Sequence, residues 1–494
     1  MTKSHMNDEK KKKLQLADSV FEKSDISRVS GKYKTNENIY TINSQSFVIE
    51  DKTNGTIITD LERNENKPDE IHPVTEVKQE RWWQITIQVG IPFFIAGLGT
   101  ISAGVILGRV EEWEVFESIP QLFILVPALL GLKGNLDMTM ASRLSTQANL
   151  GNMKTKKEIV HMVIGNISIV QVQATVAAFI ISIFAMSVGA ATTGSFQLDH
   201  ALLVTTSAMF TATSSCFVLN FVLVAVILLS NKYKVNPDNL ATPLAASIGD
   251  VVSISLLSFA VSILYANLTS HLWITYVVLG FYALILPFWI LLVLKNRYTR
   301  PVLKNGWVPV ISALIISGVG GIVLKNAVNQ FNGFVVFKPI INGIGGNLVS
   351  VQASRISTML HQMTPPGSIP IGQRIFELPW KALFYGTPYS KAARIFIIMS
   401  VPGQIIFIFI ADFIHMSAST IGVPFVFSYL IASLTQLMLL LYIAHVMIHA
   451  MWKYKIDPDS AAIPYLTALG DLLGSSLLLV AFIFLRAIGH EYDL

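Results

Sequence analysis

Charged residues and cysteine are both scarce in this sequence. Only 14% of the 494 residues are charged, whereas about a quarter of the residues of a soluble domain are. The single cysteine, Cys216, excludes an internal disulfide framework and a thiolate-rich metal site. The sequence also has no phosphate-binding glycine loop, no dinucleotide fingerprint, no nucleophile–base pair and no secretory signal pattern. These absences argue against an enzyme, and nothing indicates binding of nucleic acid.

Long apolar runs dominate the chain beyond Trp82. Each is about twenty residues long, the length that a membrane-spanning helix needs. The sequence therefore predicts an all-α polytopic membrane protein with eleven transmembrane helices. Residues 1–80 are polar and lack apolar periodicity, so we expect a disordered cytosolic N-terminal tail there. The eleven segments lie near residues 84–108, 120–148, 159–189, 200–230, 240–266, 271–294, 307–328, 336–360, 393–418, 421–450 and 461–487.

The charges of the loops orient the predicted helices. Loops rich in Lys and Arg face the cytosol. The alternating loops carry acidic residues, such as the cluster from Glu111 to Glu117. This pattern predicts a cytosolic N-terminus and an extracellular C-terminus, and the plasma membrane is the expected location. The basic loops are found at residues 154–157, 232–234, 295–304, 374–394 and 453–455.

Two stretches of the sequence each occur twice. Pro127–Thr146 (PALLGLKGNLDMTMASRLST) and Pro339–Thr358 (PIINGIGGNLVSVQASRIST) share ten residues at an offset of 212. Lys232–Asp250 (KYKVNPDNLATPLAASIGD) is matched by Lys453–Asp471 (KYKIDPDSAAIPYLTALGD) at an offset of 221. Such agreement at polar and glycine positions indicates an internal duplication.

Each copy is predicted to contain five membrane segments. Two directly joined copies with an odd number of segments would face opposite ways, but the additional segment near 271–294 returns the chain across the membrane. The two repeats are therefore predicted to be parallel, with a pseudo-twofold axis along the membrane normal and a central pathway on it. The expected domains beyond the tail are a first repeat at 81–268, a linker helix with a basic cytosolic loop at 269–304, and a second repeat at 305–494.

Two carboxylates occupy equivalent positions inside predicted membrane helices. Asp250 and Asp471 each lie about ten residues, or roughly 15 Å, inside a helix. A charge at that depth costs about 2.5–3.5 kcal/mol, and no basic residue lies within a turn of either acid. A cation bound between the two carboxylates would compensate this cost. Alternatively, the acids are protonated or hydrogen-bonded for helix packing.

Prolines in the second repeated stretch predict further oxygen ligands. Pro243 and Pro464 cannot donate to the carbonyls four positions back, which belong to Asn239 and Ser460. Free carbonyls beside a carboxylate suit a hard cation. The alternative is that both are ordinary first-turn prolines.

The first repeated stretch offers neutral oxygens beside glycines. Asn135 and Asn347 follow glycines that would break a membrane helix or pack tightly against another. Asp137 adds a carboxylate in the first copy only, because its counterpart is Val349. An ion site that includes this stretch is therefore expected to differ between the halves.

Other polar residues of the repeats have simpler interpretations. Arg143 and Arg355 are expected to snorkel to the inner interface rather than to bind an anion. Asp238 and Asp459 are expected to cap the helices that follow them rather than to line an ion mouth.

The repeated motifs resemble those of a known transporter family. The block PALLGLKGNLDMTMASRLST, its echo GIGGNLVSVQASRIST and the two Pro…Gly-Asp segments are similar to MgtE-type magnesium transporters. Two copies in one chain, over about residues 84–490, resemble solute carrier family 41. The resemblance implies a pseudo-dimeric monomer, with the fused halves standing in for two bacterial subunits, and a central ion site lined by Asp250 and Asp471. The large magnesium-sensing domains of the bacterial relatives have no counterpart in the short polar tail.

The predicted function is therefore transmembrane transport of Mg²⁺. Exchange against Na⁺ as coupling ion is the favoured mechanism, and a Mg²⁺-selective channel is the alternative. Because Mg²⁺ dehydrates reluctantly, we expect Asp250 and Asp471 to hold a hydrated ion through its water shell. Membrane lipid is the other expected partner. The rival functions are a non-transporting membrane protein that senses cations or acts as a scaffold, and an anion carrier that depends on Arg143 and Arg355.

Overall fold

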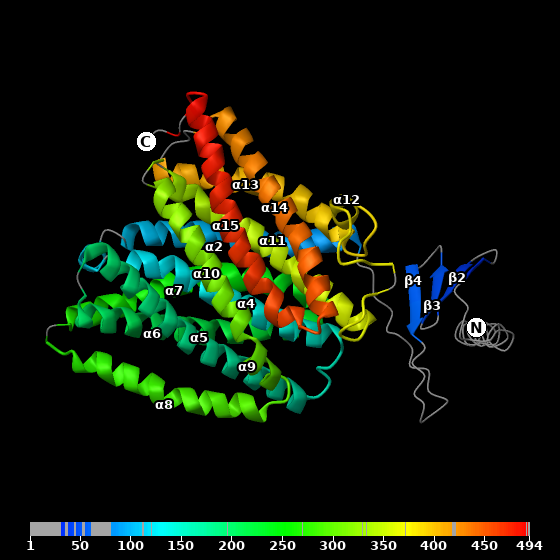
Figure 1. Cartoon of the computed structure of the whole chain (residues 1–494), viewed down its shortest axis with the longest axis horizontal. Helices are drawn as coiled ribbons and strands as arrows, with labels where there is room; N and C mark the ends of the chain where they lie inside the picture. The colour runs from blue at the N-terminus through cyan, green and yellow to red at the C-terminus, as the bar shows by residue number, and fades with distance from the viewer. Residues whose placement is uncertain are drawn as a thin grey trace. The chain divides into compact units, whose positions relative to one another are not determined.

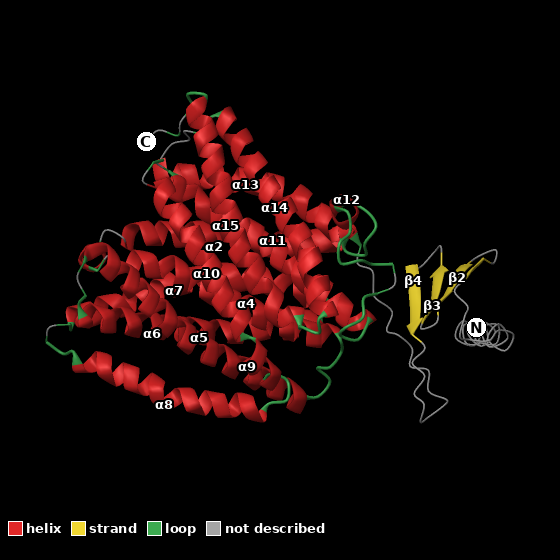
Figure 2. Cartoon of the chain, in the orientation of Figure 1, coloured by secondary structure: helices red, strands yellow, loops and turns green. Residues whose placement is uncertain are grey.

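The structure is a computed structural model with two compact units, Met1–Glu80 and Arg81–Leu494. In the first unit it describes the backbone of four strands, which form an antiparallel sheet in the order β1-β2-β3-β4. The strands are β1 (Gly31–Lys34), β2 (Asn38–Asn43), β3 (Ser46–Asp51) and β4 (Gly55–Asp60) (Figure 2). In the second unit it describes residues 81–110, 113–119, 121–194, 196–268, 270–328, 330–331, 333–370, 372–416, 421–490 and 492.

The four strands differ from the disordered tail that was predicted for residues 1–80. β2 and β3 pair with Asn43 opposite Ser46, and β3 and β4 pair with Asp51 opposite Gly55, so each connection is only two or three residues long. Runs such as NIYTIN contain the β-branched and aromatic residues that favour strands, and Asn and Gly favour tight turns. The prediction weighted the overall polarity of the segment and overlooked these short runs. The rest of the predicted tail lies outside the described residues.

The described part of the second unit is helical (Figures 1 and 2). Three helices are short: α3 (Glu114–Ser118), α9 (Arg300–Asn305) and α12 (Pro379–Leu383). The long helices are α2 (Trp82–Val110), α4 (Gln121–Asn149), α5 (Lys156–Thr193), α6 (Leu198–Lys232), α7 (Pro237–Ala266), α8 (Trp273–Lys295), α10 (Trp307–Val328), α11 (Phe334–Met363), α13 (Ser390–Met416), α14 (Val423–Lys453) and α15 (Pro458–Ala487). Every predicted membrane segment thus contains a long helix.

Within the described residues, eight of the long helices are long and apolar enough to cross a membrane. In α10 the apolar stretch found is shorter, Trp307–Gly320. The other two helices without a candidate span are α4 and α11, which carry the first repeated stretch. Both helices contain many polar side chains, which are buried inside the protein and lower the mean hydropathy of the helix. Length and composition therefore identify eight candidate spans, and the predicted number of eleven is not confirmed.

The helices form two five-membered sets with the same packing. In the first set α2, α4 and α6 pack on α7, and in the second set α10, α11 and α14 pack on α15. α8 contacts α5 and α6 at one edge of the molecule (Figure 1). Only 11% of its most apolar 18-residue stretch is buried inside the protein. α8 is therefore a peripheral connection between the two sets.

The central helices α4 and α11 run parallel to one another. Ser350 donates to Sδ of Met138, its counterpart at the offset of 212, over 3.3 Å. Two turns further along, the hydroxyls of the counterparts Thr146 and Thr358 are 3.0 Å apart. If the two helices were antiparallel, counterpart residues could contact each other at only one level. A pseudo-twofold axis therefore runs along these helices, in agreement with the predicted parallel repeats.

Aromatic packing interlocks the two sets. α2 belongs to the first set, yet Phe93 lies against Gly403 of α13, and Phe407 of α13 lies against Gly97 of α2. The two rings are 5.8 Å apart between centroids. A Cβ at either glycine would come within 2.4 Å of a ring atom. Only glycine therefore leaves room for the aromatic ring of the opposite helix. The two halves therefore share one interior.

Candidate functional site

Asp250 and Asp471 are half-buried at equivalent positions of α7 and α15. The Asp250 carboxylate interacts electrostatically with Lys133 of α4 and, less strongly, with Asp471 and Asp137. Oδ2 of Asp471 lies 4.0 Å from the point where a Cβ on Gly131 of α4 would be. The acid of the second repeat thus faces the central helix of the first, and the two acids share one electrostatic site.

Each of these acids has a lysine nearby in space. Lys133 interacts with Asp250, and Lys338 of α11 interacts with Asp471. Nδ2 of Asn342 also donates to the main-chain carbonyl of Asp471 over 3.5 Å. The prediction considered basic residues on the same helix only, and so it missed lysines that tertiary packing brings to the acids from α4 and α11. The four-residue spacing of Lys133 and Asp137 in an apolar stretch was the signal available in the sequence.

Asp137 forms an ion pair that the sequence analysis did not anticipate. Its Oδ2 lies 2.8 Å from Nζ of Lys133, and both side chains are fully buried. The ammonium also donates to the carbonyl of Ala245 over 3.2 Å. The predicted metal ligand Asp137 is therefore occupied by an ammonium group. The counterparts in α11 are Gly345 and Val349, so the pair exists in the first repeat only.

Asn135 and Asn347 are both buried on the central helices. Asn135 Oδ1 accepts a hydrogen bond from Thr467, which lies one turn before Asp471 on α15. Next to these amides are Gly134 and Gly346, and no atom lies within 4 Å of a Cβ added at either glycine. These two glycines therefore border open space rather than a tight helix contact.

Asn239 and Ser460 lie at a different level of the molecule from the acids. Each is eleven positions before its acid, which corresponds to roughly 16 Å along a helix. The Asn239 side chain donates to Gln88 over 2.8 Å and accepts from Arg355 over 2.6 Å. Ser460 donates to Asp457 over 3.0 Å in the first turn of α15. The structure does not bring these two predicted ligands to Asp250 and Asp471.

The capping roles predicted for Asp238 and Asp459 are wrong. The N-caps are Asn236 and Asp457, whose side chains accept from the main-chain N–H groups of Asp238 and Asp459. Each helix then begins with proline at its first position, as is common after an N-cap. The carboxylates of Asp238 and Asp459 are thus available to accept hydrogen bonds from other helices.

Asp238 and Asp459 tie the two repeats together. Asp238 accepts from Ser354 over 2.7 Å and from Thr358 over 2.9 Å, both on α11 of the other repeat. Asp459 accepts from Ser142 of α4 over 2.9 Å. We call these five residues the hydroxyl–carboxylate belt. It joins the ends of the central helices to the first turns of α7 and α15.

Arg143 does not snorkel as predicted. Its side chain is buried, and its Nε donates to Asn166 of α5 over 2.8 Å. The guanidinium interacts electrostatically with Asp457 and Asp459. It therefore balances the carboxylates at this end of the second repeat.

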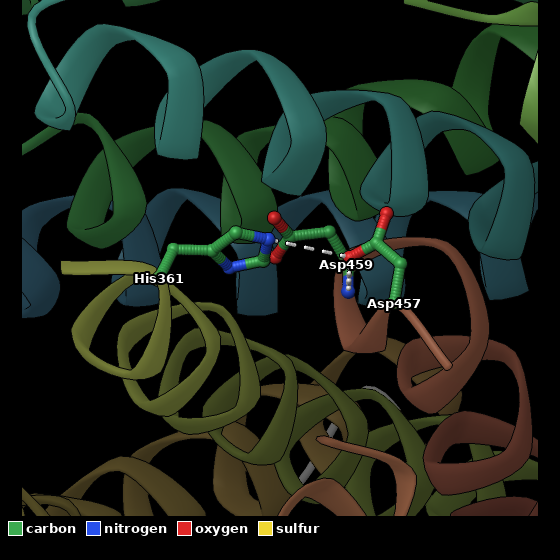
Figure 3. A group of neighbouring side chains, drawn as sticks. All are labelled: His361, Asp457 and Asp459. Atoms are coloured by element: carbon green, nitrogen blue, oxygen red, sulfur yellow. Dashed lines mark hydrogen bonds and ion pairs between the residues drawn. The ribbon is translucent and has the colours of Figure 1, made fainter. Parts of the chain in front are cut away.

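One cluster of the described residues has side chains that could hold a metal ion: His361, Asp457 and Asp459 (Figure 3). The ligand atoms lie within 4.8 Å of one another, and Nε2 of His361 is 3.7 Å from Oδ1 of Asp457. The caps and the belt already use both carboxylates, and Arg143 supplies a positive charge. The positive end of a helix also disfavours a cation.

The first repeat has amides at two of the three positions of this cluster. The counterparts of the three residues are Asn149, Asn236 and Asp238. Nδ2 of Asn149 donates to Asn236 over 3.0 Å and to Asp238 over 2.7 Å. An amide donor therefore occupies the place that His361 takes in the second repeat.

A loop between α11 and α13 is anchored on α14. Nε2 of His449 lies 2.9 Å from Gln373, and the Tyr442 hydroxyl donates to the carbonyl of Glu377 over 3.0 Å. Burial raises the pKa of the Tyr389 hydroxyl, which stays protonated and bonds to Nδ1 of His445. The two histidines thus fasten this loop.

Comparisons with known proteins identify the family. Residues 126–260 and 338–481 both match MgtE, described as a divalent cation transporter, and each range contains one copy of both repeated stretches. Solute carrier family 41 member 2 of Mus musculus is 43% identical over 409 residues, which are 82% of this chain and 71% of that protein. Member 2 of Homo sapiens is 42% identical over 409 residues, with the same shares covered. Member 3 of Rattus norvegicus is 39% identical over 401 residues, 81% of this chain and 87% of that protein.

No solved structure matches the chain significantly. The family consists of transporters, which agrees with the expectation that the chain is not an enzyme. With two MgtE regions on a helical, membrane-spanning framework, the chain belongs to solute carrier family 41 and to the MgtE family of divalent cation transporters.

Proposed function

We propose that this transporter moves Mg²⁺ between its two repeats, with the ion held by Asp250 and Asp471. The observation that carries the proposal is that the equivalent acids of the two repeats both lie beside α4: Oδ2 of Asp471 is 4.0 Å from an added Cβ on Gly131, and Asp250 follows Gly249, which lies against Lys133. Mg²⁺ prefers oxygen ligands and keeps several of its waters. Two carboxylates that share one site, beside the open space at Gly134 and Gly346, suit such a hydrated ion.

The charges around the site support exchange with Na⁺. Three carboxylates, those of Asp137, Asp250 and Asp471, interact with the ammonium groups of Lys133 and Lys338. With all five groups ionised, the described site carries a net charge of −1. A monovalent cation neutralises that charge, and a divalent one reverses it. We infer that Na⁺ and Mg²⁺ occupy the site alternately.

The neutral oxygens of Asn135 and Asn347 are proposed to complete the ion's surroundings on the central helices. We assign no direct role to Asn239 and Ser460, because they are about 16 Å from the acids along their helices. The plasma membrane, a cytosolic N-terminus, an extracellular C-terminus and action as a single pseudo-dimeric chain are parts of the same proposal. The charges of the loops support the orientation.

The proposal is tested by Mg²⁺ flux into liposomes that contain the purified full-length protein and a Mg²⁺-sensitive dye. Asp250→Asn and Asp471→Asn should each lower the rate by at least about tenfold, which corresponds to about 1.4 kcal/mol. Asp199→Asn, at an exposed acid, is the matched control and should leave the rate unchanged. Full flux in both interior variants would show that the ion does not use these acids.

The same liposomes test the coupling ion. An imposed Na⁺ gradient should drive Mg²⁺ against its own gradient if the two ions exchange. If the Mg²⁺ rate does not depend on Na⁺, exchange is excluded and a Mg²⁺ channel remains. Replacement of Na⁺ by K⁺ at equal ionic strength is the control.

A further inference from the structure

The ion pair of Lys133 and Asp137 introduces a fixed cation beside the proposed ion site. Both side chains are fully buried, and Nζ lies 2.8 Å from Oδ2. Among the charged groups around Asp250, Lys133 interacts with it most strongly. The ammonium thus pairs with Asp137 and lies against Gly249, the residue before the acid that is proposed to bind Mg²⁺.

The second repeat fills the same place with a neutral side chain. Gly345 stands where Lys133 is in the first repeat, and Gln436 of α14 packs against it, with Oε1 2.9 Å from the position of an added Cβ. Nε2 of Gln436 donates to the carbonyl of Gly470 over 2.8 Å. The counterpart of Gln436 is Ser215. The two halves therefore hold different groups, one charged and one neutral, beside equivalent acids.

The backbone of α7 leaves room for the ammonium. A Cβ on Gly249, next to Asp250, would lie 1.2 Å from Nζ of Lys133. The ammonium donates in addition to the carbonyl of Ala245 on the same helix. Lys133 is therefore seated directly on the helix that carries Asp250, one residue away from the acid.

The energetics of burial explain why a partner is needed. An isolated buried ammonium is strongly unfavourable, and a paired one is tolerated when the geometry and the hydrogen bonds are good. Asp137 supplies that pairing. While it does so, it draws the ammonium off Asp250, although the positive charge stays next to the helix that carries this acid.

We propose that Lys133 is a tethered counter-cation that competes with the transported ion for Asp250, and that Asp137 holds the ammonium away from Asp250 rather than binding the ion itself. This inference rests on the proposed function, in which Asp250 binds Mg²⁺. While the ammonium pairs with Asp137, as it does in this structure, Asp250 is left for Mg²⁺; when the ammonium turns to Asp250, it competes with the ion. The affinity of the first repeat for Mg²⁺ is thereby lowered and release is favoured.

Two sets of variants should change Mg²⁺ affinity in opposite directions. The double variant Lys133→Gly/Asp137→Val gives the first repeat the residues of the second, removes the competitor and keeps the total charge. It should lower the apparent Kd for Mg²⁺ about tenfold. Asp137→Asn leaves Asp250 as the only carboxylate near the ammonium and should raise the Kd about tenfold. Mg²⁺ binding to the purified full-length protein is measured by isothermal titration calorimetry, with Lys157→Gln, at an exposed lysine, as the control.

The thermal unfolding midpoint of each variant checks that it is folded. If the double variant is unstable because of the space that Lys133 leaves, Ser215→Gln is added, so that the neutral filling of the second repeat is reproduced in full. Opposite shifts of the Kd support the inference. Shifts in one direction, or none, would overturn it and leave the pair as a structural contact. Asp250→Asn separates the two proposals: if it retains Mg²⁺ binding, the proposed site itself is wrong, whatever the lysine variants do.

Discussion

Two equivalent glycines have different surroundings at the scale of single residues. A Cβ on Gly249 would lie 1.2 Å from the Lys133 ammonium, whereas one on Gly470 would meet Leu440 at 3.4 Å, an ordinary contact. Gly249→Ala should therefore destabilise the protein by about 1–3 kcal/mol through displacement of a buried charge. Gly470→Ala should be neutral or slightly stabilising, because alanine is the better helix former. Thermal unfolding in detergent compares the two, and equal effects would contradict this position of the ammonium.

Lys133 also marks a limit of what residue patterns reveal. The sequence indicated the two interior acids, because a carboxylate in the middle of an apolar helix is conspicuous. It did not indicate their basic partners, because Lys133 and Lys338 come from other helices and only packing brings them close. The spacing of Asp137 from Lys133 was visible, but the role of that pair depends on its distance from Asp250.

The hydroxyl–carboxylate belt suggests a prediction at the scale of helix ends. Nδ1 of His361 donates to the carbonyl of Ser357 over 2.9 Å, and its Nε2 lies 3.7 Å from Oδ1 of Asp457. In the first repeat the counterpart Asn149 places an amide donor at this point. The other charged groups at this end are Asp459 and Arg143, and the ring packs on Trp452.

His361→Asn gives the second repeat the same kind of donor that Asn149 supplies in the first. Because both partners of this contact are partly exposed, the added hydrogen bond should contribute less than about 1 kcal/mol. It should roughly offset the lost packing of the ring on Trp452, so that the unfolding midpoint in detergent changes by no more than about 1–2 °C. A much larger fall would show that the imidazole ring, rather than a donor, is what this helix end needs.

Elements were predicted more reliably than their ends and roles. Long apolar runs located a helix in each of the eleven segments. They did not show that α4 and α11, which lack a candidate span by hydropathy, are the helices that bury many polar side chains. Capping was assigned to Asp238 and Asp459, although the acceptors two positions earlier, Asn236 and Asp457, are the N-caps. Which side chain caps a helix depends on how single residues are oriented, and contacts with the other repeat determine that orientation here.

The arrangement of the whole molecule followed from the repeats. An odd number of segments per copy predicted parallel halves, and the contacts between counterparts on α4 and α11 agree with that prediction. The departures from symmetry were harder to see. Val349 opposite Asp137 was recognised, but the replacement of Lys133 by the packing of Gln436 involves a third helix and needed the structure.

The pseudo-twofold axis offers a test of whether the halves move during transport. The hydroxyls of Thr146 and Thr358 are 3.0 Å apart on this axis, so cysteines at these positions would be close enough for a disulfide. With Cys216→Ser in the background, the chain contains no other cysteine. The double variant Thr146→Cys/Thr358→Cys should cross-link the ends of α4 and α11 at the belt.

If Mg²⁺ and Na⁺ exchange by alternating access, the central helices must separate at this end, and oxidation should reduce Mg²⁺ flux in liposomes by at least about tenfold. A reducing agent should restore the flux, because it breaks the disulfide that holds the two helix ends together. Each single-cysteine variant, treated in the same way, controls for oxidation elsewhere. Flux that persists after complete cross-linking would mean that the ends of α4 and α11 stay together during transport, as in a channel whose pathway opens beside a fixed axis.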